Sequence, residues 1–296
     1  MILAAPTDFC FEAAACSYGF YLLAPNRWEA GARTLHTAVP DDEGGAWAVR
    51  IDSPHVEKVR VRVAGAKPSR PQAAAIRRSV RRILRLEEDL SSFHAICKRH
   101  PSLDGAAQKR FGRLIRSATL FEDIVKVICT CNITWKQTVA IVESIVQHYG
   151  IPTRNDPAVR CFPGAERLAA ARVSGLKNRC KLGYRAPFVL ELAREIASGR
   201  LDLSTFENDG LSSDELFKEL RTIKGVGDYA AGNLLMLLGH YDRLAVDTET
   251  VRHFKALFPR RNPTPTNIHR HYKAFQPYAF LAYWYELWTD YDGSIG

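Results

Sequence analysis

The sequence has no long uncharged apolar run and few cysteines, and these absences exclude several classes of protein. A helix that crosses a bilayer needs about 20 consecutive apolar residues. No segment approaches that length, so we expect no membrane partner. The seven cysteines are odd in number, scattered and absent after Cys180, which argues against a disulfide framework and favours a reducing compartment. The close pair Cys129 and Cys131 has no matching second pair, so we expect two small buried side chains and no metal site.

Acidic side chains are fewer than basic ones. The 296 residues include 41 Lys and Arg against 32 Asp and Glu, a formal net charge of +9. Such an excess fits a polyanionic partner, because each phosphate that Lys or Arg neutralises releases counterions. Many basic proteins bind no nucleic acid, so charge alone leaves the partner open. The first residues include Asp8 and Glu12 and no basic start, so no secretory signal is predicted.

The first part of the chain favours short strands and turns. Residues 59–63 alternate Val with Arg, a period of two that is typical of a sheet with one wet face. Residues 40–45 are rich in Asp and Gly and predict a hairpin turn. Pro68 and Pro71 then break the pattern. Strands are expected at 9–11, 18–23, 46–51 and 59–63.

From residue 72 the spacing of apolar residues becomes helical. We therefore predict a mostly helical (mostly α) protein with a small α+β N-terminal lobe: an antiparallel sheet lobe at 1–70, then a helical domain at 71–296. After the helix that begins near residue 72, helices are expected at 87–99, 105–116, 120–129, 135–149, 165–171, 184–198, 212–221, 228–239, 248–257 and 276–288.

Residues 212–238 predict a helical hairpin. A capping region at 212–215 starts an amphipathic helix, which ends near Thr222. Gly225, Val226 and Gly227 interrupt it, and a second, apolar helix follows at once. The glycines permit unusual backbone angles while Val226 turns inward. The amides at the start of the second helix would then suit a DNA phosphate without reading sequence. The alternative interpretation is an ordinary hairpin with a glycine turn.

Asp247 follows an apolar triplet in the loop at 244–248 and precedes a new helix. The simplest role of such an Asp is a helix N-cap. A catalytic role is compatible with capping, because the dipole of the helix favours a negative charge at its N-terminus.

In order and spacing, IKGVGDYAAGNLL and the later LAVDTETVRHF resemble the hairpin and catalytic Asp of the helix-hairpin-helix (HhH-GPD) DNA glycosylases. The likeness extends to the 8-oxoguanine and alkyladenine (AlkA-like) branches. LFEDIVKVICTCNITWKQTVAIVESIVQHYG is similar to the helix pair with the duplex-inserting loop, KLGYRAPFVLELAREI to another stretch of the 8-oxoguanine branch, and QPYAFLAYWYELW to the final pocket-lining helix. The resemblance covers about residues 84–290. It implies the HhH-GPD fold and Asp247 as the catalytic carboxylate.

Two departures from the family refine this expectation. Bifunctional members have, at the position of Tyr229, a lysine that attacks the sugar and then cuts the strand. Tyrosine cannot do this, and Lys224 precedes the turn and is expected to face away, so the resemblance implies hydrolysis by water without lyase activity. The four cysteines that hold an iron–sulfur cluster in other members are absent after the Asp, so no cluster is expected. No cofactor is required, although the family implies a monovalent cation held by the carbonyls of the hairpin.

The resemblance also assigns DNA contacts outside the hairpin. Asn132 corresponds to a residue inserted into the gap left by the flipped base, Tyr184 to a wedge in the opposite strand, and Arg185 to a contact with the orphaned base. Gln137 stands where the 8-oxoguanine branch has an Arg contact, which puts the opposite-base preference of that branch in doubt. For Asn132 the alternative is a helix cap.

The expected substrate pocket consists of Tyr229 and Asn233 from the hairpin and Tyr283, Trp284 and Trp288 from the last helix. Aromatic faces favour cationic alkylated purines through cation–π attraction. The alternative is that these aromatic side chains belong to the core. The 8-oxoguanine enzymes have a Gln where Tyr283 falls, which weakens that substrate.

We therefore expect a monomeric, monofunctional DNA glycosylase of base excision repair that acts on double-stranded DNA. It would flip out a damaged base, an alkylated purine in preference, and hydrolyse its N-glycosidic bond. The expected location is the bacterial cytoplasm, with the nucleoid, or a eukaryotic nucleus. The alternatives are an 8-oxoguanine or mismatch uracil/thymine glycosylase, since some hairpin glycosylases of the latter kind also place Tyr at the lysine position, and a non-catalytic helix-hairpin-helix DNA-binding protein.

Overall fold

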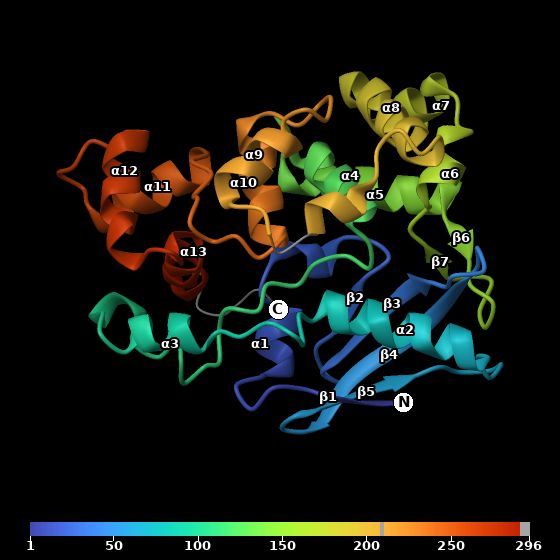
Figure 1. The fold of residues 1–296 in the computed structure, drawn as a ribbon, viewed down its shortest axis with the longest axis horizontal. Helices are drawn as coiled ribbons and strands as arrows, with labels where there is room; N and C mark the ends of the chain where they lie inside the picture. The colour runs from blue at the N-terminus through green and yellow to red at the C-terminus, as the bar shows by residue number, and fades with distance from the viewer. Residues whose placement is uncertain (208–209, 291–296) are drawn as a thin grey trace. The chain divides into compact units, whose positions relative to one another are not determined.

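A computed structural model describes residues 1–207 and 210–290 of the chain (Figure 1). By its packing the chain divides into two compact units, and neither is continuous in sequence. Unit 1 consists of Met1–Asp89 and Arg113–Leu203, and unit 2 of Leu90–Gly112 and Ser204–Gly296. The expected domain boundary after residue 70 falls at the start of a helix and stays a prediction.

Unit 1 contains a five-stranded antiparallel sheet in the order β1-β5-β4-β3-β2. Its strands are β1 (Ile2–Ala4), β2 (Arg27–Glu29), β3 (Thr34–Pro40), β4 (Ala46–His55) and β5 (Lys58–Arg62). The predicted turn at 40–45 is confirmed: the Asp41 amide donates to the Gly45 carbonyl at 2.9 Å between β3 and β4. In β5, Val59 and Val61 are fully buried, as the Val–Arg alternation predicts.

The other elements of unit 1 are helices and one two-stranded ladder. Helix α2 (Arg70–Ile83) begins with a capping box at Ser69 and packs against β3 (Figure 1). The remaining helices are α1 (Phe11–Ala15), α4 (Leu120–Thr130), α5 (Trp135–Tyr149), α6 (Ala165–Ala169), α7 (Val173–Asn178) and α8 (Ala186–Ala197), and the ladder pairs β6 (Ile151–Pro152) with β7 (Arg160–Cys161). Apolar side chains of α4 are buried along its whole length, so this helix forms the centre of the helical part of the unit.

Unit 2 is helical. Its helices are α3 (Ser91–Cys97), α9 (Ser213–Leu220), α10 (Asp228–Leu237), α11 (Thr248–Leu257), α12 (Pro265–Tyr272) and α13 (Ala279–Asp290). The early segment Leu90–Gly112 joins this unit through α13. The Tyr285 hydroxyl donates to the Asp104 carbonyl at 2.8 Å, and the rings of Phe111 and Tyr285 meet edge to face.

Three expected elements are wrong. The segments 9–11 and 18–23 are not strands: α1 starts at Phe11, and a 3-10 turn spans Gly19–Leu22. Short apolar runs do not separate strand from helix by periodicity alone. The helix expected at 105–116 is absent, because Gly105, Arg110 and Gly112 all have positive φ angles (85°, 53° and 132°).

The fold class itself is confirmed: the protein is mostly helical with a small antiparallel sheet near the N-terminus. Across the described ranges, each helix is too short or too polar to cross a membrane.

Candidate active site

The hairpin forms as its sequence predicts. Ser212 is the N-cap of α9, and Glu215 completes a capping box with it. The chain leaves α9 through Arg221 and reverses at Gly225, whose φ of 88° lies in the left-handed region that glycine favours. Val226 is only 5% exposed and its amide donates to the Ile223 carbonyl at 3.0 Å, so it packs inward as predicted.

The N-terminus of α10 opens to the surface of unit 2. Gly227, its N-cap, is exposed and has no side chain that could cap the helix. A Cβ placed on it meets no atom within 4 Å. The amide of Ala231 donates to the Gly227 carbonyl at 2.9 Å and closes the first turn of α10. The first amides of an α-helix have no acceptor within the helix and point out of its N-terminus, the arrangement that suits an anion.

Close packing places α10 against the segment that leads to Asp247. Gly232 is buried in α10, and a Cβ added there would lie 2.9 Å from the Cβ of Ala245. Real Cβ atoms do not approach so closely, so only glycine lets this segment lie at its observed distance from the helix. The contact is two residues before Asp247 in the chain.

Asp247 is half-buried and is the N-cap of α11. Its Oδ1 accepts two hydrogen bonds of 2.8 Å, one from the Thr250 amide and one from the Thr250 hydroxyl. Among the described residues no donor contacts Oδ2. The expected cap is therefore present, and it engages one oxygen of the carboxylate while the other is left without a hydrogen bond from the described protein.

Thr250 also contacts a residue of another helix. Its hydroxyl oxygen lies 3.3 Å from the hydroxyl oxygen of Tyr283 on α13. Both residues are buried, with 1% and 4% of their surfaces exposed. Burial raises the pKa of Tyr283, and the nearby Asp247 carboxylate raises it further, so this phenol stays protonated.

The five residues expected to line a pocket lie in unit 2 but face different surroundings. The Asn233 side chain donates to the Tyr229 carbonyl at 2.9 Å, and Tyr229 is half-buried. Trp284 is half-buried and stacks on Phe280. Tyr283 packs into the core, edge to face with His253.

Trp288 lies in a separate aromatic cluster. Its ring is 5.4 Å from that of Phe111 and stacks on Tyr285, and the ammonium of Lys109 lies 5.2 Å from its ring centroid. Its assignment to a substrate pocket stays a prediction.

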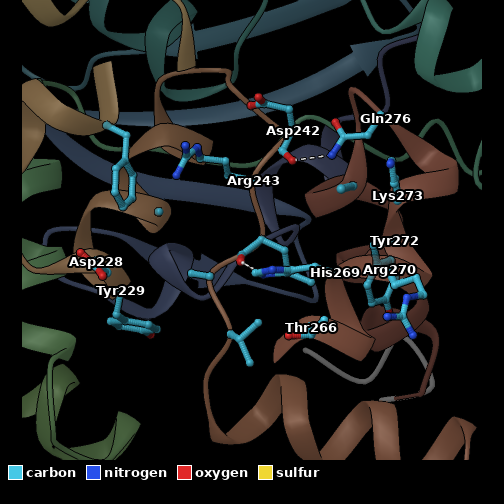
Figure 2. Close-up of a pocket in the computed structure, with 16 residues that line it drawn as sticks. Asp228, Tyr229, Asp242, Arg243, Thr266, His269, Arg270, Tyr272, Lys273 and Gln276 are labelled. Carbon is cyan, nitrogen blue, oxygen red and sulfur yellow. Dashed lines mark hydrogen bonds between the residues drawn. The ribbon is translucent and has the colours of Figure 1, made fainter. Parts of the chain in front are cut away.

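A cavity of about 770 Å³ lies beside the hairpin (Figure 2). Asp228 and Tyr229 lie on one side of it and residues of α12 on the other, with the segment 242–246 between them. Two hydrogen bonds tie that segment to the α12 side: the Gln276 amide donates to the Asp242 carbonyl at 2.7 Å, and the His269 ring nitrogen lies 3.1 Å from the Leu244 carbonyl. Asp247 does not line this cavity.

Three of the expected DNA contacts meet in unit 1. Asn132, in the loop between α4 and α5, has a φ of 51°, and its side-chain amide donates to the Tyr184 hydroxyl at 3.1 Å. Arg185 is 6% exposed, and its guanidinium donates to the carbonyls of Cys131, at 3.0 Å from Nε, and of Asn132, at 3.3 Å. It also lies 4.5 Å from the centroid of the Tyr184 ring. Asn132 and Tyr184 are exposed, and Arg185 holds the loop beneath them.

Gln137 has a structural partner. Thr134 is the N-cap of α5, and the Oε1 of Gln137 accepts the Thr134 amide at 3.1 Å in a capping box. Thr134 is therefore the residue that caps the N-terminus of α5, so Asn132 does not cap that helix. Asn132 directly follows Cys131, the C-cap residue of α4. The predicted DNA contact of Gln137 stays a prediction.

Thr250, Gly232 and Ala245 were not predicted from the sequence as part of the site. The signal for Thr250 was present, because a polar residue three positions after an N-cap completes a capping box. Gly232 stands inside an apolar helix, where glycine is unfavourable and indicates a close approach of another segment.

The hairpin and the capping Asp lie within the stretch of chain that the model of a family of DNA repair proteins matches. The model described as "HhH-GPD superfamily base excision DNA repair protein" matches residues 125–277, more than half of the chain. The chain belongs to the HhH-GPD superfamily of base excision DNA repair proteins.

Relatives are known by sequence and by structure. DNA-3-methyladenine glycosylase 2 of Escherichia coli (strain K12) is 28% identical over 197 residues, which are 63% of this chain and 66% of that protein, just under two thirds of its length. The 3-methyladenine DNA-glycosylase of Archaeoglobus fulgidus has a TM-score of 0.79 at 20% identity, over 99% of both chains. The 8-oxoguanine glycosylase/lyase of Clostridium acetobutylicum, in complex with double-stranded DNA containing cytosine opposite 8-oxoguanine, has a TM-score of 0.70 at 14% identity, over 99% of this chain and 98% of that one. At these identities the two structures establish a shared fold.

Proposed function

We propose that this protein is a monofunctional DNA glycosylase of base excision repair that removes an alkylated purine by hydrolysis. The observation that carries the proposal is the state of Asp247: one carboxylate oxygen is fixed by Thr250, and the other has no donor among the described residues. Membership of a base excision repair family and the name of the Escherichia coli relative support it. Double-stranded DNA is the proposed partner, and the structural relative bound to such DNA is consistent with this.

Asp247 has the chemistry that this reaction needs. Cleavage of an N-glycosidic bond builds positive charge on the deoxyribose, and a carboxylate placed beside that charge stabilises the transition state. The base leaves with the electron pair of the bond, and water adds to the sugar carbon and loses a proton. Oδ2 would face the sugar or orient the water, because Oδ1 is already engaged.

Tyr229 supports hydrolysis over lyase chemistry. A lyase needs an amine that forms a Schiff base with the sugar, and the hairpin helix carries a phenol at this position. Lys224 lies before the turn and is exposed. An intact abasic site is therefore the proposed product.

The preference for alkylated purines rests on chemistry and on relatives. A cationic alkylated base is attracted to an aromatic face, and Tyr229 and Trp284 are half-buried aromatic side chains in unit 2. Two relatives are named as 3-methyladenine glycosylases. The monomeric state and a cytoplasmic or nuclear location stay predictions.

The hairpin turn fits the monovalent cation that the family implies. Hard cations bind carbonyl oxygens, and among the described residues the carbonyls of Arg221, Thr222, Gly225 and Val226 accept no hydrogen bond. These residues would hold the ion, and the ion would add positive charge beside a bound phosphate. Catalysis by Asp247 does not require it.

The test is a panel of duplexes, each containing one alkyladenine, hypoxanthine, 8-oxoguanine or uracil. After incubation with the full chain, one half of each sample is treated with hot alkali, which cleaves abasic sites, and the other half is not. We expect cleavage of the alkyladenine duplex only after alkali. Asp247→Asn should lower the rate about 10²-fold or more while DNA binding is retained, because the charge is lost and the shape is kept.

Each contrary result has a distinct meaning. Excision by Asp247→Asn at the normal rate would refute the role of Asp247. Cleavage without alkali, or a covalent adduct trapped by borohydride, would refute hydrolysis by water. Release of 8-oxoguanine or uracil in preference would correct the substrate, and release of no base from any duplex would leave a DNA-binding protein.

A further inference from the structure

The side chain of Thr250 does more than complete a helix cap. Its hydroxyl oxygen accepts the Asp247 amide at 3.4 Å, which is the side-chain contact that a capping box of α11 needs. The same hydroxyl also lies 2.8 Å from Asp247 Oδ1, 3.3 Å from the Ala245 carbonyl and 3.3 Å from the Tyr283 hydroxyl. These further contacts connect the proposed catalytic carboxylate to the loop before it and to α13, a different helix of unit 2.

The distances assign the hydrogens. Thr250 has one hydroxyl hydrogen, and Asp247 Oδ1, a charged acceptor at 2.8 Å, is the strongest partner for it. The hydroxyl oxygens of Thr250 and Tyr283 lie 3.3 Å apart. Because the hydrogen of Thr250 is committed to Asp247, the hydrogen between these two oxygens has to come from Tyr283. Burial raises the pKa of Tyr283, which keeps that hydrogen in place. The order of donation is therefore from Tyr283 to Thr250 to Asp247.

Burial makes this arrangement selective for one oxygen. Thr250 and Tyr283 are 1% and 4% exposed, so water has little access to compete for their hydroxyls. The Thr250 amide and hydroxyl both donate to Oδ1, which fixes the rotation of the carboxylate. Oδ2 is thereby held in one place without a donor of its own among the described residues.

We infer that Thr250 is a positioning residue, with Tyr283 behind it, which orients the Asp247 carboxylate so that Oδ2 acts on the sugar. This inference rests on the proposed function. It gives Tyr283 a different role from the one expected from sequence, because its hydroxyl supports the carboxylate from the core.

The experiment compares Thr250→Val, which keeps the shape and removes the hydroxyl, with Thr250→Ser, which keeps the hydroxyl. Single-turnover excision is measured on the duplex that the wild-type chain cleaves best, below the melting temperature of every variant. Affinity is measured with the same duplex carrying 2′-fluorine on the lesion nucleotide, which slows glycosidic cleavage. We expect Thr250→Val to excise about 10²-fold more slowly with unchanged affinity, since misplacement of a reacting group has this cost. Thr250→Ser should excise at nearly the wild-type rate.

Tyr283→Phe tests whether the Tyr283 hydroxyl acts on Asp247 through Thr250. Loss of one neutral hydrogen bond should slow excision about 2- to 10-fold. If Tyr283 acts through Thr250, the double variant Thr250→Val/Tyr283→Phe should excise at the rate of Thr250→Val alone. Multiplication of the two effects would overturn the inferred order.

The outcomes separate this inference from the proposed function. If the wild-type chain releases no base, the proposed function fails and the inference falls with it. If the wild-type chain excises and Thr250→Val matches it, the inference alone is refuted. Equal losses in Thr250→Val and Thr250→Ser, in parallel with their melting temperatures, would show that Thr250 is only a helix cap.

Discussion

The half-buried carboxylate of Asp247 is held by the buried hydroxyl of Thr250, which in turn contacts Tyr283. The loop before Asp247 packs against Gly232, and Asp247 itself has ordinary helix-cap geometry. Around Asn132 the exposed side chains stand on a loop with a left-handed residue, and a buried guanidinium holds its carbonyls. The first region restricts one carboxylate to one orientation, as the proposed excision requires. The second holds a backbone shape and leaves its side chains exposed, as the proposed contact with DNA requires. In both regions the residue that faces outward depends on a buried one.

The largest effect that would test this comparison is expected from Gly232→Ala. The gain in helix propensity is about 0.5–1 kcal/mol and the cost of overpacking about 1–3 kcal/mol, so the free energy of unfolding should fall by about 2 kcal/mol or less. Excision should fall about 10- to 100-fold, because the new methyl group displaces Ala245 and with it Asp247. Denaturant unfolding and single-turnover excision measure the two quantities.

The matched control moves the methyl group to the other side of the contact. Gly232→Ala combined with Ala245→Gly removes the clash between the two Cβ atoms, so excision should recover. If the single variant excises normally, the contact with Gly232 does not hold the loop before Asp247. The region around Asp247 would then not depend on close packing for the orientation of its carboxylate.

An effect of comparable size on the free energy of unfolding, without displacement of Asp247, is expected from Arg185→Met, which removes the donors to Cys131 and Asn132. The free energy of unfolding should fall by about 1–3 kcal/mol, and hydrogen exchange at residues 131–134 should increase. Arg185→Lys keeps the charge and loses the planar fork, so it should behave like the Met variant. Full protection of the loop in the Lys variant would show that charge alone holds it.

The smallest effect is expected from Tyr184→Phe, which removes only the hydrogen bond to Asn132. Both residues are exposed, so the free energy of unfolding should change by about 0.5 kcal/mol or less. Tyr184→Ala, which also removes the ring, should weaken DNA binding more than Tyr184→Phe does. Equal binding by the two variants in a gel-shift assay would argue against a wedge at this position.

The parts that could be predicted from sequence are those with local signals. The hairpin is specified by a capping box and a Gly-Val-Gly turn, and β5 by its alternation. The inner strand β3 was missed because most of its residues are buried and it shows no alternation. The helix expected at 105–116 failed where Gly105 and Gly112, which are signals of a break in a helix, adopt positive φ angles; only the positive φ of Arg110 has no signature in the sequence.

At the site, resemblance and local pattern identified Asp247 as the candidate carboxylate and Asn132 as a candidate DNA contact. The distant residues that help to hold these two could not be paired with them from the sequence. Arg185 lies 53 positions from Asn132, and Tyr283 lies 33 from Thr250. Such pairings depend on tertiary packing, which no local pattern encodes.

The division of unit 2 into two stretches of chain has a consequence for synthesis. On the ribosome, unit 1 has all of its residues once Leu203 has emerged, whereas Leu90–Gly112 must wait for α13. During that interval Phe111 is without the ring of Tyr285 that later covers it. A premature stop before α13 would leave Phe111 uncovered on a chain whose first unit is complete, a product prone to aggregation and suited to capture by chaperones.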